Sequence, residues 1–241
     1  MKIDIFYSPN FNKEKKRSKK SIKFIVFHYT GMQSERESLA RLSDPRSKVS
    51  AHYLINRNGK IYRLIQDNQI AWHAGKSCWG KYENLNKNSL GIELVNKGHS
   101  FGYTSFSKKQ LLSLVKLSQY LIKKYKIKKK YIVGHSDIAP LRKIDPGEKF
   151  PWQELAKKKI GIWHNYKKDF LKQFRKTKIS KENKLKFFKN INNIGYCTFD
   201  KNKLILNKTV IAFQRHYRKE LINGLVDQEC TIIAKNLSKN V

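Results

Sequence analysis

Short runs of β-branched and aromatic residues, each closed by a turn signal, constrain the fold of this 241-residue chain more than any other feature. Residues 22–29 (IKFIVFHY) end at a Thr-Gly pair, which is typical of a buried strand closed by a turn. Residues 51–65 hold two apolar segments around Asn58-Gly59, a strong hairpin signal. Residues 89–96 (SLGIELVN) and 131–133 (YIV) are further candidate strands. Together these segments predict one β-sheet.

A long amphipathic helix lies between the last two candidate strands. Residues 107–125 begin with Ser107, a good N-cap, and their apolar side chains recur at helical spacing. Strands that alternate with such a helix indicate an α/β or α+β domain, with a central mixed sheet flanked by helices.

The chain is long enough for one catalytic domain and a smaller second unit. We expect a catalytic domain over residues 1–160 and a lysine-rich linker or bridging helix over 161–190. Residues 191–241 are then a small helical domain. One helical face is indicated there by Val210, Phe213, Tyr217 and Leu221, which are spaced by 3, 4 and 4 residues.

Charge dominates the composition, since 52 Lys and Arg face 18 Asp and Glu, for a formal net charge of +34. Such a surface attracts anionic polymers, either nucleic acid or an acidic cell envelope. Compositional drift in an AT-rich coding sequence explains the same excess of lysine. No helix-turn-helix, zinc-finger or RNA-binding motif accompanies the charge, so we expect no specific nucleic-acid partner.

The cysteines and the first residues bear on the compartment. Cys78, Cys197 and Cys230 are far apart and form no CxxC pair, so no disulfide framework is implied. Residues 1–20 lack the apolar core of a secretory signal, and no apolar stretch is long enough to cross a bilayer. We therefore expect an intracellular protein, or one of the envelope or periplasm if a leader has been removed.

Three potential metal ligands follow strand-like segments: His28 in FHYTG, His135 in VGHSDIAP and Asp145 in RKIDPG. Ligands collect where the strands of a sheet end. Two imidazoles and one carboxylate suit a zinc ion that keeps a fourth position open for water, as catalytic zinc does. Any one of these histidines taken singly is more often an ordinary hydrogen-bonded residue, so the argument depends on the group.

Two further residues complete a hydrolytic set. Glu93 lies inside an apolar strand, where desolvation raises a carboxyl pKa, so it is a candidate general base and then general acid. Lys143 precedes Asp145 by two residues in an extended segment and therefore faces the same way, where it can stabilise an oxyanion. The alternatives are a salt-bridged structural carboxylate and a solvated loop charge.

The order of motifs over residues 22–152 resembles the N-acetylmuramoyl-L-alanine amidases of the AmpD and AmiD type, whose fold is shared with phage amidases and animal peptidoglycan recognition proteins. The motifs are FIVFHYTG, SAHYLINRNGKIYRLI, AWHAGKS, SLGIELVN, VGHSDIAP and KIDPGEKFPW. The resemblance implies zinc on His28, His135 and Asp145, catalysis by Glu93 and Lys143, and peptidoglycan or a muropeptide as substrate.

The resemblance also suggests substrate-binding residues: Tyr29, Trp72, His73 and His52. We expect the two histidines to be structural or groove-lining, because three ligands already fill the metal site. Residues 194–241 resemble a peptidoglycan-binding helical module, which either anchors glycan or stabilises the catalytic domain. A non-catalytic peptidoglycan sensor is the alternative function. The choice between intact wall polymer and soluble fragments, and the oligomeric state, stay open.

Overall fold

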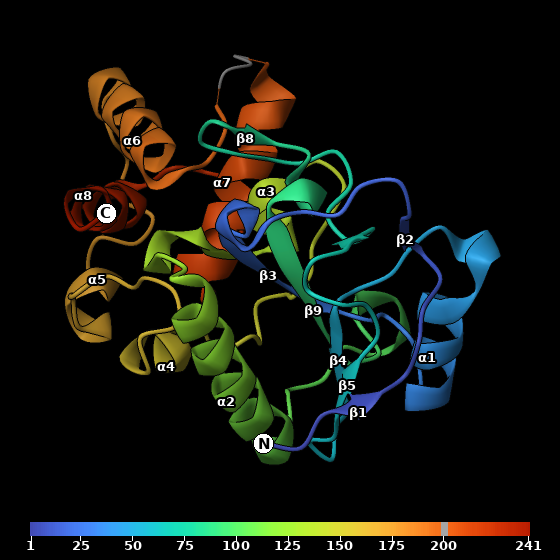
Figure 1. Cartoon of the computed structure of the whole chain (residues 1–241). Helices are drawn as coiled ribbons and strands as arrows, with labels where there is room; N and C mark the ends of the chain where they lie inside the picture. Colours follow the sequence, from blue (N-terminus) through green and yellow to red (C-terminus); the bar gives the residue numbers. More distant parts are fainter. Residues whose placement is uncertain (199–201) are drawn as a thin grey trace.

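The computed structural model describes residues 1–198 and 202–241, and its centre is a mixed sheet (Figure 1). The strand order is β1 (Asp4–Ile5), β5 (Ile61–Arg63), β4 (Tyr53–Ile55), β9 (Ser89–Leu94), β3 (Phe24–Tyr29) and β10 (Ile132–Gly134). Neighbouring strands run parallel except for the β4–β5 pair, which is antiparallel. The predicted mixed sheet is therefore confirmed.

Two short antiparallel ladders lie outside this sheet: β2 (Phe11–Asn12) with β6 (Ile70–Ala71), and β7 (Cys78–Trp79) with β8 (Tyr82–Glu83). The α-helices are α1 (Glu35–Ser43), α2 (Lys108–Tyr125), α3 (His135–Ile138), α4 (Trp152–Lys157), α5 (Lys168–Lys172), α6 (Lys181–Ile194), α7 (Lys203–Tyr217) and α8 (Gln228–Lys239). Short 3₁₀ turns are η1 (Lys19–Ser21), η2 (Pro45–Ser47), η3 (Leu85–Lys87), η4 (His99–Phe101) and η5 (Lys129–Tyr131).

The hairpin and the long helix form where the sequence predicts them. The β4–β5 turn contains Gly59 with a φ of +89°, a left-handed conformation that favours glycine. The Ser107 hydroxyl accepts a hydrogen bond from the Gln110 backbone N–H at 3.1 Å, which caps α2. Both predictions are therefore confirmed.

The two faces of the sheet have different partners. One face packs against α2, and its buried side chains include Ile25, Phe27, Leu90 and Ile92 from the strands and Leu114, Leu117 and Leu121 from the helix. The other face carries Phe24, Val26 and His28, the alternate residues of β3. Phe24 and Val26 belong to the same apolar cluster as residues of α6, α7 and α8, so the C-terminal helices and the sheet share one core.

The C-terminal region contains several helices. Residues 161–190, for which we expect a lysine-rich linker or bridging helix, contain α5 and the start of α6. Val210, Phe213 and Tyr217 are buried on one face of α7, as predicted. Leu221 lies beyond the helix, which ends at Tyr217. The helical spacing of the sequence thus extends past the end of the helix.

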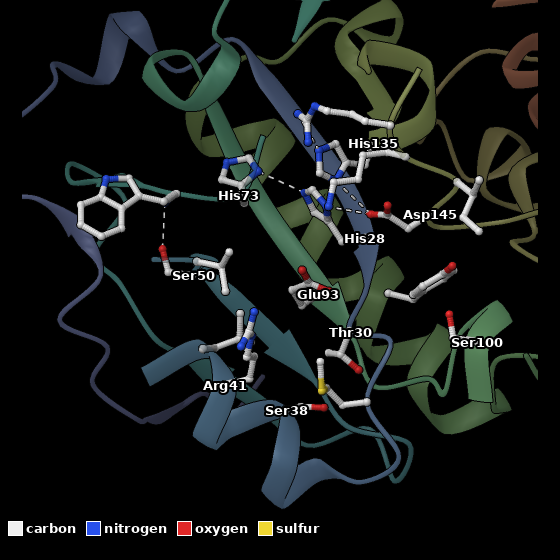
Figure 2. A pocket seen from close by; sticks show the side chains of 18 residues that line it. His28, Thr30, Ser38, Arg41, Ser50, His73, Glu93, Ser100, His135 and Asp145 are labelled. Atoms are coloured by element: carbon white, nitrogen blue, oxygen red, sulfur yellow. Dashed lines mark hydrogen bonds and ion pairs between the residues drawn. The ribbon is translucent and has the colours of Figure 1, made fainter. Parts of the chain in front are cut away.

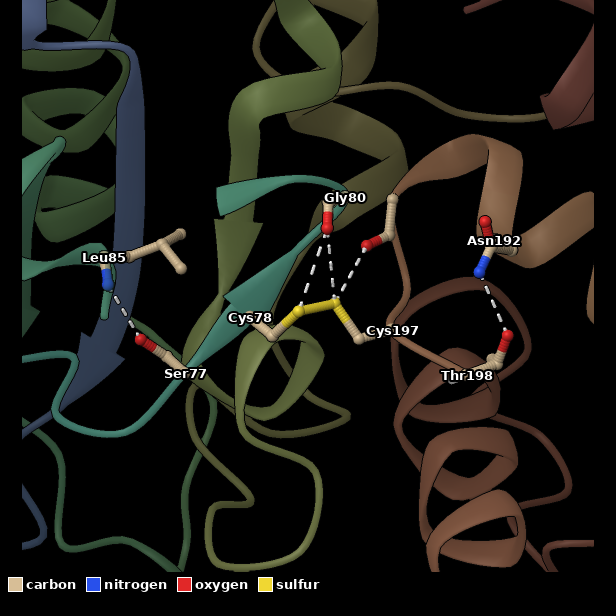
Figure 3. The surroundings of a disulfide bond; sticks show 8 residues. Ser77, Cys78, Gly80, Leu85, Asn192, Cys197 and Thr198 are labelled. Carbon is tan, nitrogen blue, oxygen red and sulfur yellow. Dashed lines mark hydrogen bonds between the residues drawn. A yellow bond between two sulfur atoms is a disulfide. The ribbon is translucent and has the colours of Figure 1, made fainter. Parts of the chain in front are cut away.

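A disulfide bond joins Cys78 of β7 to Cys197, 119 residues later, and so links the β7–β8 ladder to the segment between α6 and α7 (Figure 3). Cys230 is buried and free. The spacing of the cysteines implies no disulfide framework and does not reveal this bond, because only tertiary folding brings Cys78 and Cys197 together. Within the described residues, no helix is long and apolar enough to cross a membrane.

Candidate metal centre and active site

His28, His135 and Asp145 converge at one edge of the sheet. His28 is the penultimate residue of β3, His135 begins α3 directly after β10, and Asp145 lies in the loop after α3. Because β3 and β10 are parallel neighbours, their carboxyl ends meet at this edge. Asp145 Oδ2 lies 3.0 Å from His28 Nδ1 and 3.1 Å from His135 Nδ1, and the two Nδ1 atoms are 3.0 Å apart. The structure therefore brings the three predicted ligands together.

The distal nitrogen of each imidazole has its own partner. His28 Nε2 lies 3.1 Å from His73 Nδ1 (Figure 2). His135 Nε2 lies 3.2 Å from the Ala74 carbonyl oxygen. Metal-binding histidines are oriented in this way, with one nitrogen towards the ion and the other bonded to the protein. The three converging atoms are a donor set that fits a divalent cation.

The charges of the cluster agree with this interpretation. Burial lowers the pKa of His28 to about 4, with a further contribution from His135, so its ring is neutral at pH 7. A neutral imidazole is the protonation state that ligates a metal.

Glu93 lies opposite His28 in the register of β9 and β3, so both side chains are on the same face of the sheet. Its Oε2 atom is buried and makes no hydrogen bond within the part of the chain that the structure describes. Burial raises the pKa of Glu93 to about 8; nearby Asp145 raises it further and the Lys143 ammonium opposes the rise. This carboxyl group can take up and release a proton near neutral pH.

A cavity of about 360 Å³ opens over the cluster. Both Glu93 and Lys143 line it together with the three potential ligands, so the structure places all five predicted residues at one site. Figure 2 shows Glu93 beside the three potential ligands. Arg41 of α1 and Arg142 line the same cavity. The cavity is therefore lined by several positively charged side chains.

The four predicted substrate-binding residues divide into two groups. Tyr29, Trp72 and His73 line the cavity. Burial raises the pKa of Tyr29 to about 12, so its phenol is neutral, and its hydroxyl contacts His99 Nδ1 at 2.9 Å. His52 does not line the cavity, because its ring is buried and its Nδ1 accepts from the Gly91 backbone N–H at 3.0 Å. Of the two roles expected for His52, the structural one agrees with these contacts.

Sequence reasoning missed three residues of the site. Arg41 lines the cavity from a helix for which the sequence analysis gave no prediction. Arg142 stands next to Lys143 in the LRKID motif, a signal that was present but unused. Its guanidinium donates to the Ala74 and Lys76 carbonyl oxygens. Asn86 Oδ1 accepts hydrogen bonds from the backbone N–H groups of His73 and Ala74. Nothing in the sequence around Asn86 indicates this role.

Comparison with known proteins gives consistent matches. Residues 18–148 match the family model for N-acetylmuramoyl-L-alanine amidase. The chain is 36% identical to the N-acetylmuramoyl-L-alanine amidase AmiD of Escherichia coli K12, over 90% of this chain and 82% of AmiD. It is also 36% identical to the 1,6-anhydro-N-acetylmuramyl-L-alanine amidase AmpD of Haemophilus influenzae, over 61% of this chain and 86% of AmpD.

A solved structure of Escherichia coli AmiD, in complex with the substrate anhydro-N-acetylmuramic acid-L-Ala-D-gamma-Glu-L-Lys, has the same fold. It aligns with a TM-score of 0.81 and 32% sequence identity, and the alignment covers 95% of this chain and 92% of AmiD. The similarity thus includes the C-terminal helices as well as the central sheet.

Proposed function

The chain belongs to the N-acetylmuramoyl-L-alanine amidase family, and we propose that it hydrolyses the amide bond between N-acetylmuramic acid, or its anhydro form, and L-alanine with the help of zinc. His28, His135 and Asp145 would hold the ion. The observation that carries this proposal is the convergence of two Nδ1 atoms and one carboxylate oxygen, all within 3.1 Å of one another, at a cavity that also contains Glu93. This is the ligand set of catalytic zinc.

Glu93 and Lys143 have different roles in the proposed reaction. A bound zinc ion supplies Lewis acidity, which makes water more acidic and polarises the carbonyl group. Glu93 takes a proton from the attacking water and passes it to the amide nitrogen, which leaves as the amine of L-alanine. The Lys143 ammonium pairs with the oxyanion of the tetrahedral intermediate. The other product is the carboxylate of the muramic acid lactyl group.

The raised pKa of Glu93 is compatible with a role as base. In the absence of a cation its pKa is about 8. A divalent charge nearby favours the ionised carboxylate, so the pKa falls towards neutrality when the site is loaded. Glu93 can then accept a proton at the start of the reaction and release it at the end.

The substrate proposal extends to the stem peptide. AmiD was solved with an anhydro-muropeptide that contains a γ-linked glutamate, and AmpD is named for its anhydro substrate. Arg41, Arg142 and Lys143 give the cavity of this chain a positive charge, which complements the free carboxylates of such a peptide. We therefore favour soluble muropeptides, including the anhydro form, as substrates.

The alternative function is a non-catalytic protein that only binds peptidoglycan. Binding alone does not require a buried carboxyl group with a raised pKa next to a metal-ligand triad. Burial of an unpaired carboxyl group is costly, and Glu93 lies where such a group serves proton transfer. This arrangement favours the enzyme.

For the C-terminal helices, we propose a supporting role in addition to any binding of glycan. Asp137 of α3 is buried and accepts hydrogen bonds from Tyr196 Oη at 2.6 Å and His216 Nδ1 at 2.8 Å. These contacts tie α3, which begins with His135, to residues of the predicted helical unit. The shared apolar core supports the same interpretation.

Product analysis by mass spectrometry tests the proposal. The zinc-loaded protein is incubated with anhydro-muropeptide and, separately, with intact sacculi. We expect release of the free stem peptide from the muropeptide, loss of activity with a chelator, and loss of activity in Glu93→Ala. Glu154→Ala, at an exposed position of α4, is the matched control and retains activity. Absence of released peptide from both substrates would overturn the proposal.

A further inference from the structure

A chain of buried polar groups lies behind His28, on the side away from Asp145. His28 Nε2 contacts His73 Nδ1 at 3.1 Å, and His73 Nε2 contacts the Ser89 hydroxyl at 3.1 Å. Ser89 in turn donates to the Leu85 carbonyl oxygen at 2.6 Å. His28, His73 and Ser89 are all less than a tenth exposed. The chain of contacts therefore ends on a carbonyl oxygen, which can only accept a hydrogen bond.

This end group determines the direction of every hydrogen bond. The single hydroxyl proton of Ser89 goes to the Leu85 carbonyl oxygen, so Ser89 Oγ accepts from His73 Nε2–H. A neutral imidazole has one N–H group, so His73 Nδ1 accepts from His28 Nε2–H. His28 Nδ1 then carries a lone pair and faces Asp145. The sequence of donors leaves the metal-binding nitrogen free of a proton.

The surroundings of His73 keep its ring neutral. The ring packs between the rings of His28 and His52, at centroid distances of 5.1 and 5.6 Å. The Arg17 guanidinium lies 2.7 Å from the far nitrogen of His52. A second positive charge enclosed between these groups would be repelled. The His73 ring is therefore neutral and carries one N–H group.

Ala74, the residue after His73, orients His135. The Ala74 carbonyl oxygen lies 3.2 Å from His135 Nε2 and can only accept, while Arg142 Nη2 lies 3.4 Å from the same nitrogen. A neutral His135 ring that donates from Nε2 to Ala74 presents its Nδ1 lone pair to Asp145. Asn86 Oδ1 accepts the backbone N–H groups of His73 at 3.1 Å and Ala74 at 2.7 Å. One side chain thus fixes the backbone of both residues that support the imidazoles.

Strand β9 leaves room for this arrangement at Gly91. A Cβ atom added to Gly91 would lie 2.5 Å from His73 Cγ, closer than any ordinary contact. The His73 ring therefore occupies the space that a side chain at position 91 would fill. The ring position depends on a glycine two residues before Glu93.

We infer that His73 and Ser89 are positioning residues that hold His28 in its Nε2–H tautomer, while the Ala74 carbonyl oxygen does the same for His135. The inference rests on the proposed metal site. Two nitrogen lone pairs and a carboxylate oxygen within 3.1 Å repel one another until a cation binds between them. The hydrogen-bond chain therefore prepares the site for a cation before the cation arrives.

Ser89→Ala is the informative change. Without the hydroxyl, His73 Nε2–H is buried without an acceptor, an arrangement that is unfavourable. The reversed tautomer is then preferred: His73 Nδ1–H donates to His28 Nε2, and His28 carries its proton on Nδ1 towards Asp145. We expect the dissociation constant for zinc to rise by about 10–100-fold. Ser118→Ala removes another buried serine hydroxyl, in α2 and outside the site, and is the matched control.

Nitrogen-15 NMR of the histidine side chains reads the tautomers directly in the metal-free protein. We expect Nε2–H tautomers for His28 and His135 in the wild type, and an Nδ1–H tautomer for His28 in Ser89→Ala. An Nδ1–H tautomer of His28 in the wild type would overturn the inference, as would a Ser89→Ala protein with unchanged tautomer and zinc affinity. This NMR measurement needs no zinc, so it separates the two proposals. If the wild-type protein shows the expected tautomers but binds no zinc, the proposed metal site is refuted and the hydrogen-bond chain is confirmed.

A second pair of variants keeps the test valid if Ser89→Ala does not fold. His73→Asn retains an oxygen acceptor close to the position of Nδ1, so it holds His28 in the Nε2–H tautomer and stays within about threefold of the wild-type zinc affinity. His73→Leu has a similar volume and no acceptor, so it loses affinity by about 10–100-fold. Equal zinc affinities for the two variants would contradict the inference.

Discussion

Replacement of Glu93 by glutamine should change the pH dependence of stability in the metal-free protein. Burial raises the pKa of Glu93 from 4.5 to about 8. The folded state therefore holds the proton at pH values where the unfolded state has lost it. For a carboxyl group whose folded pKa is raised, stability is full below about pH 4.5 and falls until about pH 8.

The magnitude follows from the size of the shift. Each pH unit in this window costs about 1.4 kcal/mol of unfolding free energy. Between pH 4.5 and pH 7 the ionisable carboxyl therefore costs about 3 kcal/mol, and less to the extent that water reaches the side chain. Glu93→Gln has no titratable group there, so it should exceed the wild type in stability at pH 7 by about 2–3 kcal/mol.

Urea denaturation of both proteins in the presence of a chelator, at several pH values from 4.5 to 8, measures this difference. The chelator is necessary because a bound cation favours the ionised carboxylate and lowers its pKa. Glu154→Gln, at an exposed site, controls for the general effect of removing a carboxylate. A stability difference between Glu93→Gln and the wild type that does not grow with pH would refute the reasoning.

Three other changes have outcomes that the structure specifies. Lys143→Met should lower kcat about 10²–10³-fold with unchanged zinc content, because Lys143 lines the cavity but is not a ligand; unchanged kcat in a steady-state assay would remove it from the mechanism. Reduction of the Cys78–Cys197 bond should lower the unfolding free energy by about 2–4 kcal/mol, and a urea midpoint that is insensitive to reductant would contradict this. Arg218→Met removes the buried partner of Asp227 and should cost about 3 kcal/mol by urea denaturation; a stability loss below 1 kcal/mol would show that the pair is not needed.

The sheet and the metal cluster could be predicted because the signals that specify them are local. A run such as residues 22–29 encodes a buried strand by itself, and a polar residue at its end is visible in the sequence. Once the strands are parallel neighbours, their ends meet at one edge, which brings His28 and His135 together. Asp145 and Lys143 were found from their spacing and from the resemblance of their motif.

The supporting contacts could not be predicted, because they depend on the path of the loops. Asn86, Ser89 and Arg142 act on backbone groups or on side chains that are distant in the sequence. The LRKID motif and the strand at residues 89–96 place Arg142 and Ser89 near the site, but they do not indicate which distant groups these side chains contact. Tertiary contacts also explain why α7 ends early: buried Arg218 pairs with Asp227 and Glu229, and the chain turns there.

The most direct test of the account is the location of the metal. Protein treated with a chelator and then loaded with zinc can be crystallised, and diffraction data collected on both sides of the zinc absorption edge show where the ion binds. We expect one ion per chain, in contact with Nδ1 of His28, Nδ1 of His135 and a carboxylate oxygen of Asp145, and no ion in Asp145→Ala. Zinc bound elsewhere in the chain, or full occupancy in Asp145→Ala, would contradict the account.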